Sequence, residues 1–145
     1  MRVYALMGLS VWWVASACDD TVKDSGMGFT DTGPVTTETP THDVDIQPLW
    51  DANCTDAGCH SDSDAAGGLS LVSGYDALVD VASPGGAELP LVSPGSSADS
   101  YLWHKLEGTQ TSVTGGGGSQ MPFGGTLTPD ELTTIQAWID GGAPR

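Results

Sequence analysis

Basic residues are scarce in this chain. Its 145 residues include four Lys and Arg against 19 Asp and Glu, which gives a formal net charge of −15. A chain this acidic is not expected to bind nucleic acid or anionic lipid headgroups by electrostatic attraction. The charge is compatible with redox partner proteins that present a basic docking face, and equally with an acidic surface that keeps the protein soluble.

Sequence signatures of the common enzyme classes are missing as well. The chain has no serine nucleophile elbow, no paired catalytic carboxylates and no glycine-rich phosphate loop. We therefore expect a protein that is not an enzyme.

The N-terminal apolar run is short. Residues 3–14 follow Arg2 and are too few to span a bilayer and stay there, so residues 1–17 are predicted to be a cleaved signal peptide. Small residues at 15–17 precede Cys18 and resemble a bacterial lipobox, in which cleavage leaves a lipid-modified cysteine that anchors the protein to a membrane. Ordinary secretory cleavage at the same point, leaving a thiol, is the alternative.

A polar segment separates the signal peptide from the rest of the chain. Residues 18–43 are dominated by Thr, Asp, Gly and Pro and hold almost no large apolar side chains, which predicts a disordered, lipid-anchored tether. The folded domain is expected over residues 44–145, a length that supports one small core.

Two segments have the spacing of short amphipathic helices. Ile46 and Trp50 lie four residues apart, and the helix that they predict ends at Cys54. A second helix is expected over residues 99–107, because Gly108 is a typical helix terminator.

The C-terminal helix has the clearest signals. Thr128 is suited to the N-cap, Pro129 to the first helical position and Glu131 to a capping box, and Gly141 follows the last apolar position. The segments between helices are long, rich in Gly, Ser and Pro, and show few strand signals. We expect a mainly α fold whose apolar core is thin without an additional group at its centre.

Residues 54–60, CTDAGCH, combine two thiols with a directly following histidine. These are the elements of covalent haem c attachment, in which Cys54 and Cys59 add to the vinyl groups and His60 is an axial ligand of the iron. The common motif is C-x-x-C-H, and this chain has the longer C-x4-C-H form. Met121, followed by Pro122 in a glycine-rich loop expected to be flexible, offers a thioether sulfur for the other axial position.

Two other uses of the cysteines stay open. Cys54 and Cys59 are also able to form a disulfide that closes a small loop in an exported domain. A zinc site has four suitable ligands but lacks the spacing of a zinc finger. The four residues are Cys54, Cys59, His60 and His104.

The second axial ligand also has alternatives. Met121 taken alone is better explained as a core residue, and its loop context and Pro122 are what favour a ligand role. His104 competes with it as the distal ligand, although its helix neighbours Trp103 and Lys105 favour a position on the outer face.

Several motifs, read together, resemble a known family. The cysteine pair with its histidine is followed by GGLSL, then LVSPGSSADSYLWHKL, then MPFGGTLTPDELTTIQAWIDGGAP. This order is similar to the small cytochrome c domains of many exported bacterial proteins, including the planctomycete-type group, and it covers nearly all of residues 46–144. The resemblance implies a cytochrome c-like helical domain with Cys54 and Cys59 as attachment cysteines, His60 as proximal ligand and Met121 as distal ligand.

The sequence therefore predicts an exported, lipid-anchored monohaem cytochrome c domain that transfers electrons at the periplasmic side of the cell envelope. The competing hypothesis is a surface lipoprotein without haem, stapled by a disulfide and serving a binding or structural role. A haem-based sensor is a third possibility that the sequence does not separate from electron transfer.

Overall fold

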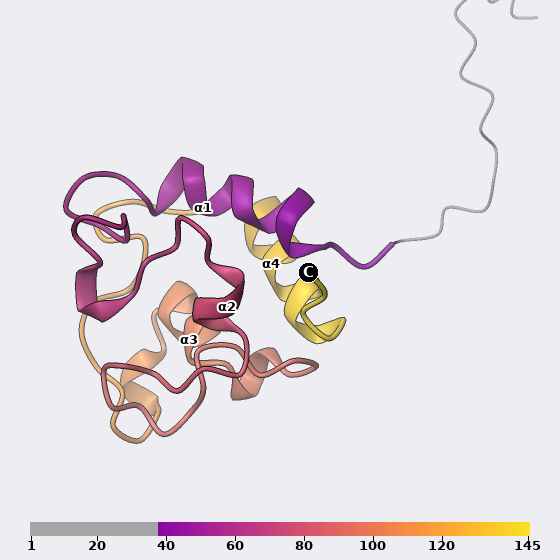
Figure 1. The fold of residues 1–145 in the computed structure, drawn as a ribbon. Coiled ribbons are helices and arrows are strands. Elements are labelled where there is room, and N and C mark those ends of the chain that lie inside the picture. Colours follow the sequence, from indigo (N-terminus) through magenta and orange to yellow (C-terminus); the bar gives the residue numbers. More distant parts are fainter. Residues whose placement is uncertain (1–37) are drawn as a thin grey trace, which may run out of the picture. The chain divides into compact units, whose positions relative to one another are not determined.

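The computed structural model describes residues 38–145. The expected signal peptide, the lipid site at Cys18 and most of the expected tether lie outside these residues. Figure 1 shows the helices in chain order: α1 (Gln47–Asn53), α2 (Tyr75–Leu78), α3 (Tyr101–Glu107) and α4 (Pro129–Asp140). Over the described range no β-strand forms, and the pairing between extended segments is limited to isolated bridges. The expected mainly helical fold is confirmed.

Helix α1 continues from a single π-helical turn, His42–Ile46, which begins two residues before the expected start of the domain. Ile46 and Trp50 are fully buried, as their four-residue spacing predicts. Cys54 is the C-cap of α1, and its N–H donates to the carbonyl of Trp50. The apolar face of the helix thus leads directly into the first cysteine of the motif.

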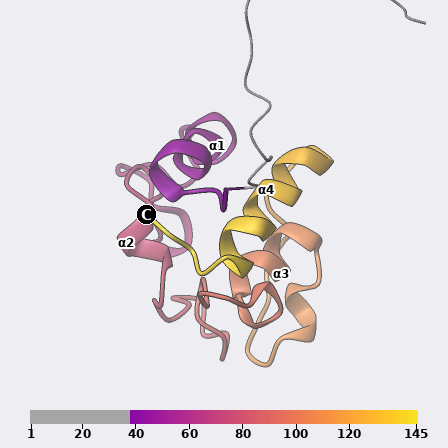
Figure 2. The same cartoon turned by 90° about the vertical axis from the view of Figure 1, so that its right-hand side faces the viewer.

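The start and the end of the domain lie together. The His42 N–H donates to the carbonyl of Pro144 at 2.9 Å, and helix α4 contacts the His42–Ile46 turn, as Figure 2 shows. Trp138 reaches the same carbonyl with its indole N–H at 2.9 Å. The two chain segments that bound the domain are therefore joined through one shared acceptor.

Helix α4 is capped as expected. The Thr128 side chain accepts from the Glu131 N–H, and the Glu131 carboxylate accepts from the Thr128 N–H at 2.7 Å. The Thr128 N–H and the Thr128 hydroxyl both donate to this carboxylate, and they lower the pKa of Glu131 because they stabilise its charged form. Ile135, Trp138 and Ile139 are fully buried.

Helix α3 differs from its expected form in two respects. It begins at Tyr101, because Ser97–Asp99 form a separate 3-10 turn that the Ser96 side chain caps. Gly108 ends it with a φ of 78°, as expected. The outer-face position expected for His104 was inferred from its neighbours Trp103 and Lys105, but Trp103 is buried, because this short helix has the core on more than one side, and His104 itself is half-buried.

Helix α2 is a single turn, and its four residues are too few to show a helical period in the sequence. Its Leu78 side chain is fully buried, and the Leu78 carbonyl accepts a hydrogen bond from the Val92 N–H. Within residues 38–145, no helix combines the length and the apolar character needed to cross a membrane.

Candidate functional site

The segment between Cys54 and His60 folds back on itself as a compact loop. The His60 N–H donates to the Cys54 carbonyl at 2.9 Å, and the Cys59 N–H donates to the Asp56 carbonyl at 2.9 Å. Gly58 has a φ of 83°, a conformation that favours glycine. The turn thus accommodates the two residues by which this motif exceeds C-x-x-C-H, and the backbone of His60 stays close to that of Cys54.

The His60 ring is oriented by one hydrogen bond. Its Nδ1 lies 3.0 Å from the Leu69 carbonyl, which accepts only, so Nδ1 carries the proton and donates. In the neutral ring, Nε2 is then the unprotonated nitrogen, the form in which imidazole binds a metal. The Leu71 N–H closes the arrangement by donating to the His60 carbonyl at 2.8 Å. The sequence offered no signal for this bond, because it joins residues nine apart in an irregular loop.

The loop that follows His60 is held by Asp64. The backbone N–H of Gly58 and the hydroxyls of Ser61 and Ser63 donate to the Asp64 carboxylate and lower its pKa. This network lies on the exposed side of the loop and connects the turn between the cysteines to the segment after the histidine.

Both cysteines are half-buried thiols that are not joined to each other. Burial raises the pKa of Cys54 to about 11, and the neighbouring Cys59 and Glu131 add to the effect. Reactive and disulfide-exchanging cysteines have lowered pKa values, since the thiolate is the nucleophile. Cys54 is therefore not poised for redox exchange by itself.

This raised pKa predicts slow alkylation of Cys54 in protein produced without haem maturation. With the pKa moved from 9.0 to about 11, the thiolate fraction at pH 8 falls about 100-fold. A thiolate of higher pKa is also more nucleophilic, so iodoacetamide should label Cys54 about tenfold more slowly in the folded protein than in urea, as followed by peptide mass spectrometry. Equal rates in the two states would contradict the buried, neutral thiol.

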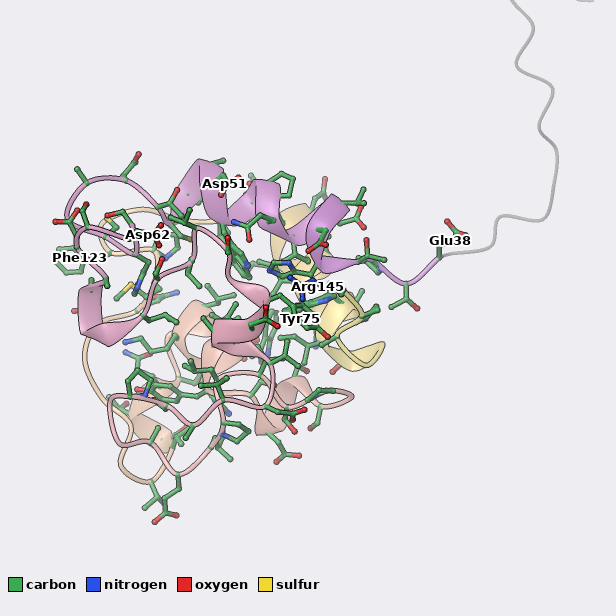
Figure 3. The ribbon with its side chains drawn as sticks, viewed as in Figure 1. Glu38, Asp51, Asp62, Tyr75, Phe123 and Arg145 are labelled. Atoms are coloured by element: carbon green, nitrogen blue, oxygen red, sulfur yellow. The ribbon has the colours of Figure 1, made fainter. Side chains whose placement is uncertain are left out.

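Met121 is half-buried and packs against the same hydrophobic core as Cys54. The expected flexible loop around it is instead held to α3, since the Met121 N–H donates to the Lys105 carbonyl at 2.9 Å. Two residues later, Phe123 is 78% exposed. In Figure 3, Phe123 and Asp62, which follows the attachment motif, lie at the same end of the domain.

His104 is engaged elsewhere. Its Nδ1 lies 2.8 Å from the Thr109 hydroxyl and its Nε2 lies 3.0 Å from the Ala98 carbonyl. Both ring nitrogens therefore have local partners, and neither is free for an iron ligand. Among residues 38–145, no group of three or more His, Cys, Asp or Glu side chains is placed to hold a metal ion, so the zinc alternative with Cys54, Cys59, His60 and His104 gains no support.

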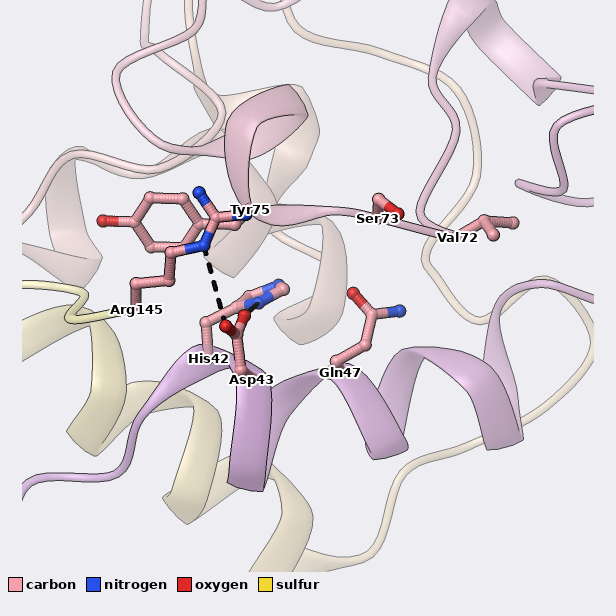
Figure 4. A pocket seen from close by; sticks show the side chains of 7 residues that line it. All are labelled: His42, Asp43, Gln47, Val72, Ser73, Tyr75 and Arg145. Carbon is pink, nitrogen blue, oxygen red and sulfur yellow. Dashed lines mark hydrogen bonds and ion pairs between the residues drawn. The ribbon is translucent and has the colours of Figure 1, made fainter.

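Two surface pockets lie away from the cysteine motif. The first, about 170 Å³, is lined by residues that include His42, Tyr75 and Arg145, and Figure 4 shows the ion pair of Arg145 with Asp43 beside it. The second, about 260 Å³, has His104 in its lining. Neither pocket is lined by the cysteines, His60 or Met121.

The residues present fit a c-type haem by their chemistry. Two thiols, an imidazole with a free Nε2 and a thioether are the donor set that such a haem needs. Comparisons with protein-family models, with curated proteins and with solved structures gave no match to this chain.

Proposed function

We propose that the domain carries one covalently attached haem c and transfers electrons at the cell envelope. The observation that carries this proposal is the state of His60. It directly follows Cys59, and its Nδ1 is bound to the Leu69 carbonyl, which leaves Nε2 available as an axial ligand. An imidazole nitrogen available as a ligand therefore lies in the same short segment as two unpaired thiols.

Each of the four residues has a distinct role in this proposal. Cys54 and Cys59 would hold the haem through thioether bonds, and His60 would supply a nitrogen ligand to the iron. Met121 would supply a soft sulfur ligand, and a His/Met ligand pair raises the reduction potential compared with two histidines. A bound haem c supplies one-electron chemistry. With side chains at both axial positions no face is left for a substrate, and the protein is not an enzyme in this account.

The location follows from the N-terminal sequence. A signal peptide over residues 1–17 would export the chain, and lipid on Cys18 would anchor it through the tether of residues 18–43. Export also supplies the oxidising compartment in which c-type haem proteins mature. The net charge of −15 favours redox partners with a basic docking face.

The test is to remove the attachment cysteines. The protein is expressed with its own signal in a host whose c-type maturation accepts the four-residue spacing, and haem is detected on a denaturing gel by its peroxidase stain. The double variant Cys54→Ala/Cys59→Ala should lose all retained haem, because no thioether bond can form. Cys18→Ala should retain the haem while losing the lipid.

Two outcomes would contradict the proposal. Haem retained in the double cysteine variant would show that attachment does not use these thiols. A colourless wild-type protein whose stability falls on reduction would favour the disulfide-stapled lipoprotein instead.

A further inference from the structure

The glycine-rich segment before Met121 is packed against helix α3. Tyr101 binds Gly117 twice, since its hydroxyl donates to the Gly117 carbonyl at 3.0 Å and accepts from the Gly117 N–H at 2.9 Å. The Gln110 side chain donates to the Gly118 carbonyl at 2.9 Å. Tyr101 and Gln110 are both buried, so these bonds are shielded from water.

The packing leaves no room for larger residues at one of these glycines. A Cβ on Gly116 would collide with the carbonyl oxygen of Gln110 and would approach the Tyr101 ring to 3.0 Å. Gly116 therefore serves close backbone approach rather than flexibility. The glycine-rich segment has the composition of a linker, but it is packed into the domain.

Lys105 makes the contacts nearest to Met121. Its ammonium donates to the Gly117 carbonyl at 3.1 Å and to the Ser119 carbonyl, while its own carbonyl accepts from the Met121 N–H at 2.9 Å. Partial burial lowers the pKa of Lys105. The adjacent Gln120 side chain donates to the Leu106 carbonyl at 2.8 Å, one residue further along the same helix.

We infer that helix α3 is the platform that holds Met121 in its ligand position, with Lys105 as the positioning residue. This inference rests on the proposed haem ligation. The Lys105 side chain binds the Ser119 carbonyl, and the Lys105 carbonyl binds the Met121 N–H. The backbone is thus fixed to α3 on both sides of Gln120, and this is the backbone that presents the Met121 sulfur. Hydrogen bonds from a charged donor are among the stronger ones in proteins, so the Lys105 ammonium is suited to fixing this segment.

The test measures how often Met121 leaves the iron. Carbon monoxide binds the ferrous haem only when the sulfur has dissociated, so its binding rate follows the population of the open form. In the full-length haem protein, Lys105→Met should raise this rate about tenfold, which corresponds to about 1.4 kcal/mol in the ligation equilibrium. Tyr101→Phe, which removes both bonds to Gly117, should raise it as well.

Two control variants separate positioning from general effects. Lys23→Gln removes the same charge outside the described residues and should leave the rate unchanged. Thr128→Ala removes the N-cap of α4 and lowers the free energy of unfolding by about 1 kcal/mol, but should not change carbon monoxide binding. A rate increase in Thr128→Ala equal to that in Lys105→Met would overturn the inference, because any loss of stability would then suffice.

The remaining outcomes assign failure to one proposal or the other. If the haem is attached and Met121→Ala opens the iron, but Lys105→Met and Tyr101→Phe keep the wild-type rate, the platform role is wrong and the haem proposal stands. If the wild-type protein retains no haem, the proposed function itself fails and the inference falls with it.

Discussion

Replacing Met121 with alanine is expected to lower the reduction potential of the haem protein and to open the ferrous iron to carbon monoxide. The reason is that a thioether stabilises the ferrous state, and its removal leaves the distal face without a protein ligand. Potentiometric titration and a carbon monoxide difference spectrum measure the two effects. Both should be large, because in the proposed ligation the variant removes a bond to the iron rather than altering its surroundings.

The matched control for this variant is His104→Ala. Both nitrogens of His104 are occupied by Ala98 and Thr109, so its removal should leave the potential and the spectrum at their wild-type values. The opposite pattern, a silent Met121→Ala and an altered His104→Ala, would transfer the distal role to His104. It would also require α3 to rearrange when the haem is attached.

Replacing Trp138 with alanine is expected to lower the free energy of unfolding by about 3–5 kcal/mol. Trp138 has no exposed surface, packs its ring 5.7 Å from that of His42 and donates to the Pro144 carbonyl. Its removal leaves a large cavity at the point where the two ends of the domain meet. Urea unfolding followed by circular dichroism gives the difference from the wild type.

Phe123→Ala is the control for this stability loss. Phe123 is also aromatic but is 78% exposed, so its truncation should cost less than about 0.5 kcal/mol. A similar loss in both variants would mean that the measured effect does not come from core packing. A loss below about 1 kcal/mol for Trp138→Ala would place the main stabilisation elsewhere, for example in the attached haem.

Local signals were sufficient for the helix ends. The capping box of Thr128 and Glu131, the stop at Gly108 and the end of α1 at Cys54 depend on residues within one turn of each other. These features are therefore present in the sequence itself. The mainly helical fold follows from the same local patterns.

Contacts between distant segments could not be predicted from local sequence signals. The burial of Trp103 depends on which elements cover α3, and a helical period does not carry that information. The glycine-rich segment before Met121 has the composition of a flexible linker. Its order comes from Tyr101 and Lys105, more than ten residues earlier in the chain.

The candidate site likewise has one part that the sequence predicts and another part that depends on the folded structure. Spacing alone identifies Cys54, Cys59 and His60 as one group, because these residues are adjacent in the chain. The bond from His60 to the Leu69 carbonyl, the raised pKa of Cys54 and the engagement of His104 depend on the folded loop. These tertiary features depend on contacts that the spacing of residues along the chain does not show.

The most direct test of the account is a pyridine haemochrome spectrum of the wild-type protein. The protein is expressed with its own signal in a host that matures C-x4-C-H sites, and loose haem is removed with acid-acetone. The account predicts that haem remains, with an α band at the position typical of two thioether bonds. Complete loss of haem under these conditions would contradict it and leave the disulfide-stapled lipoprotein as the better description.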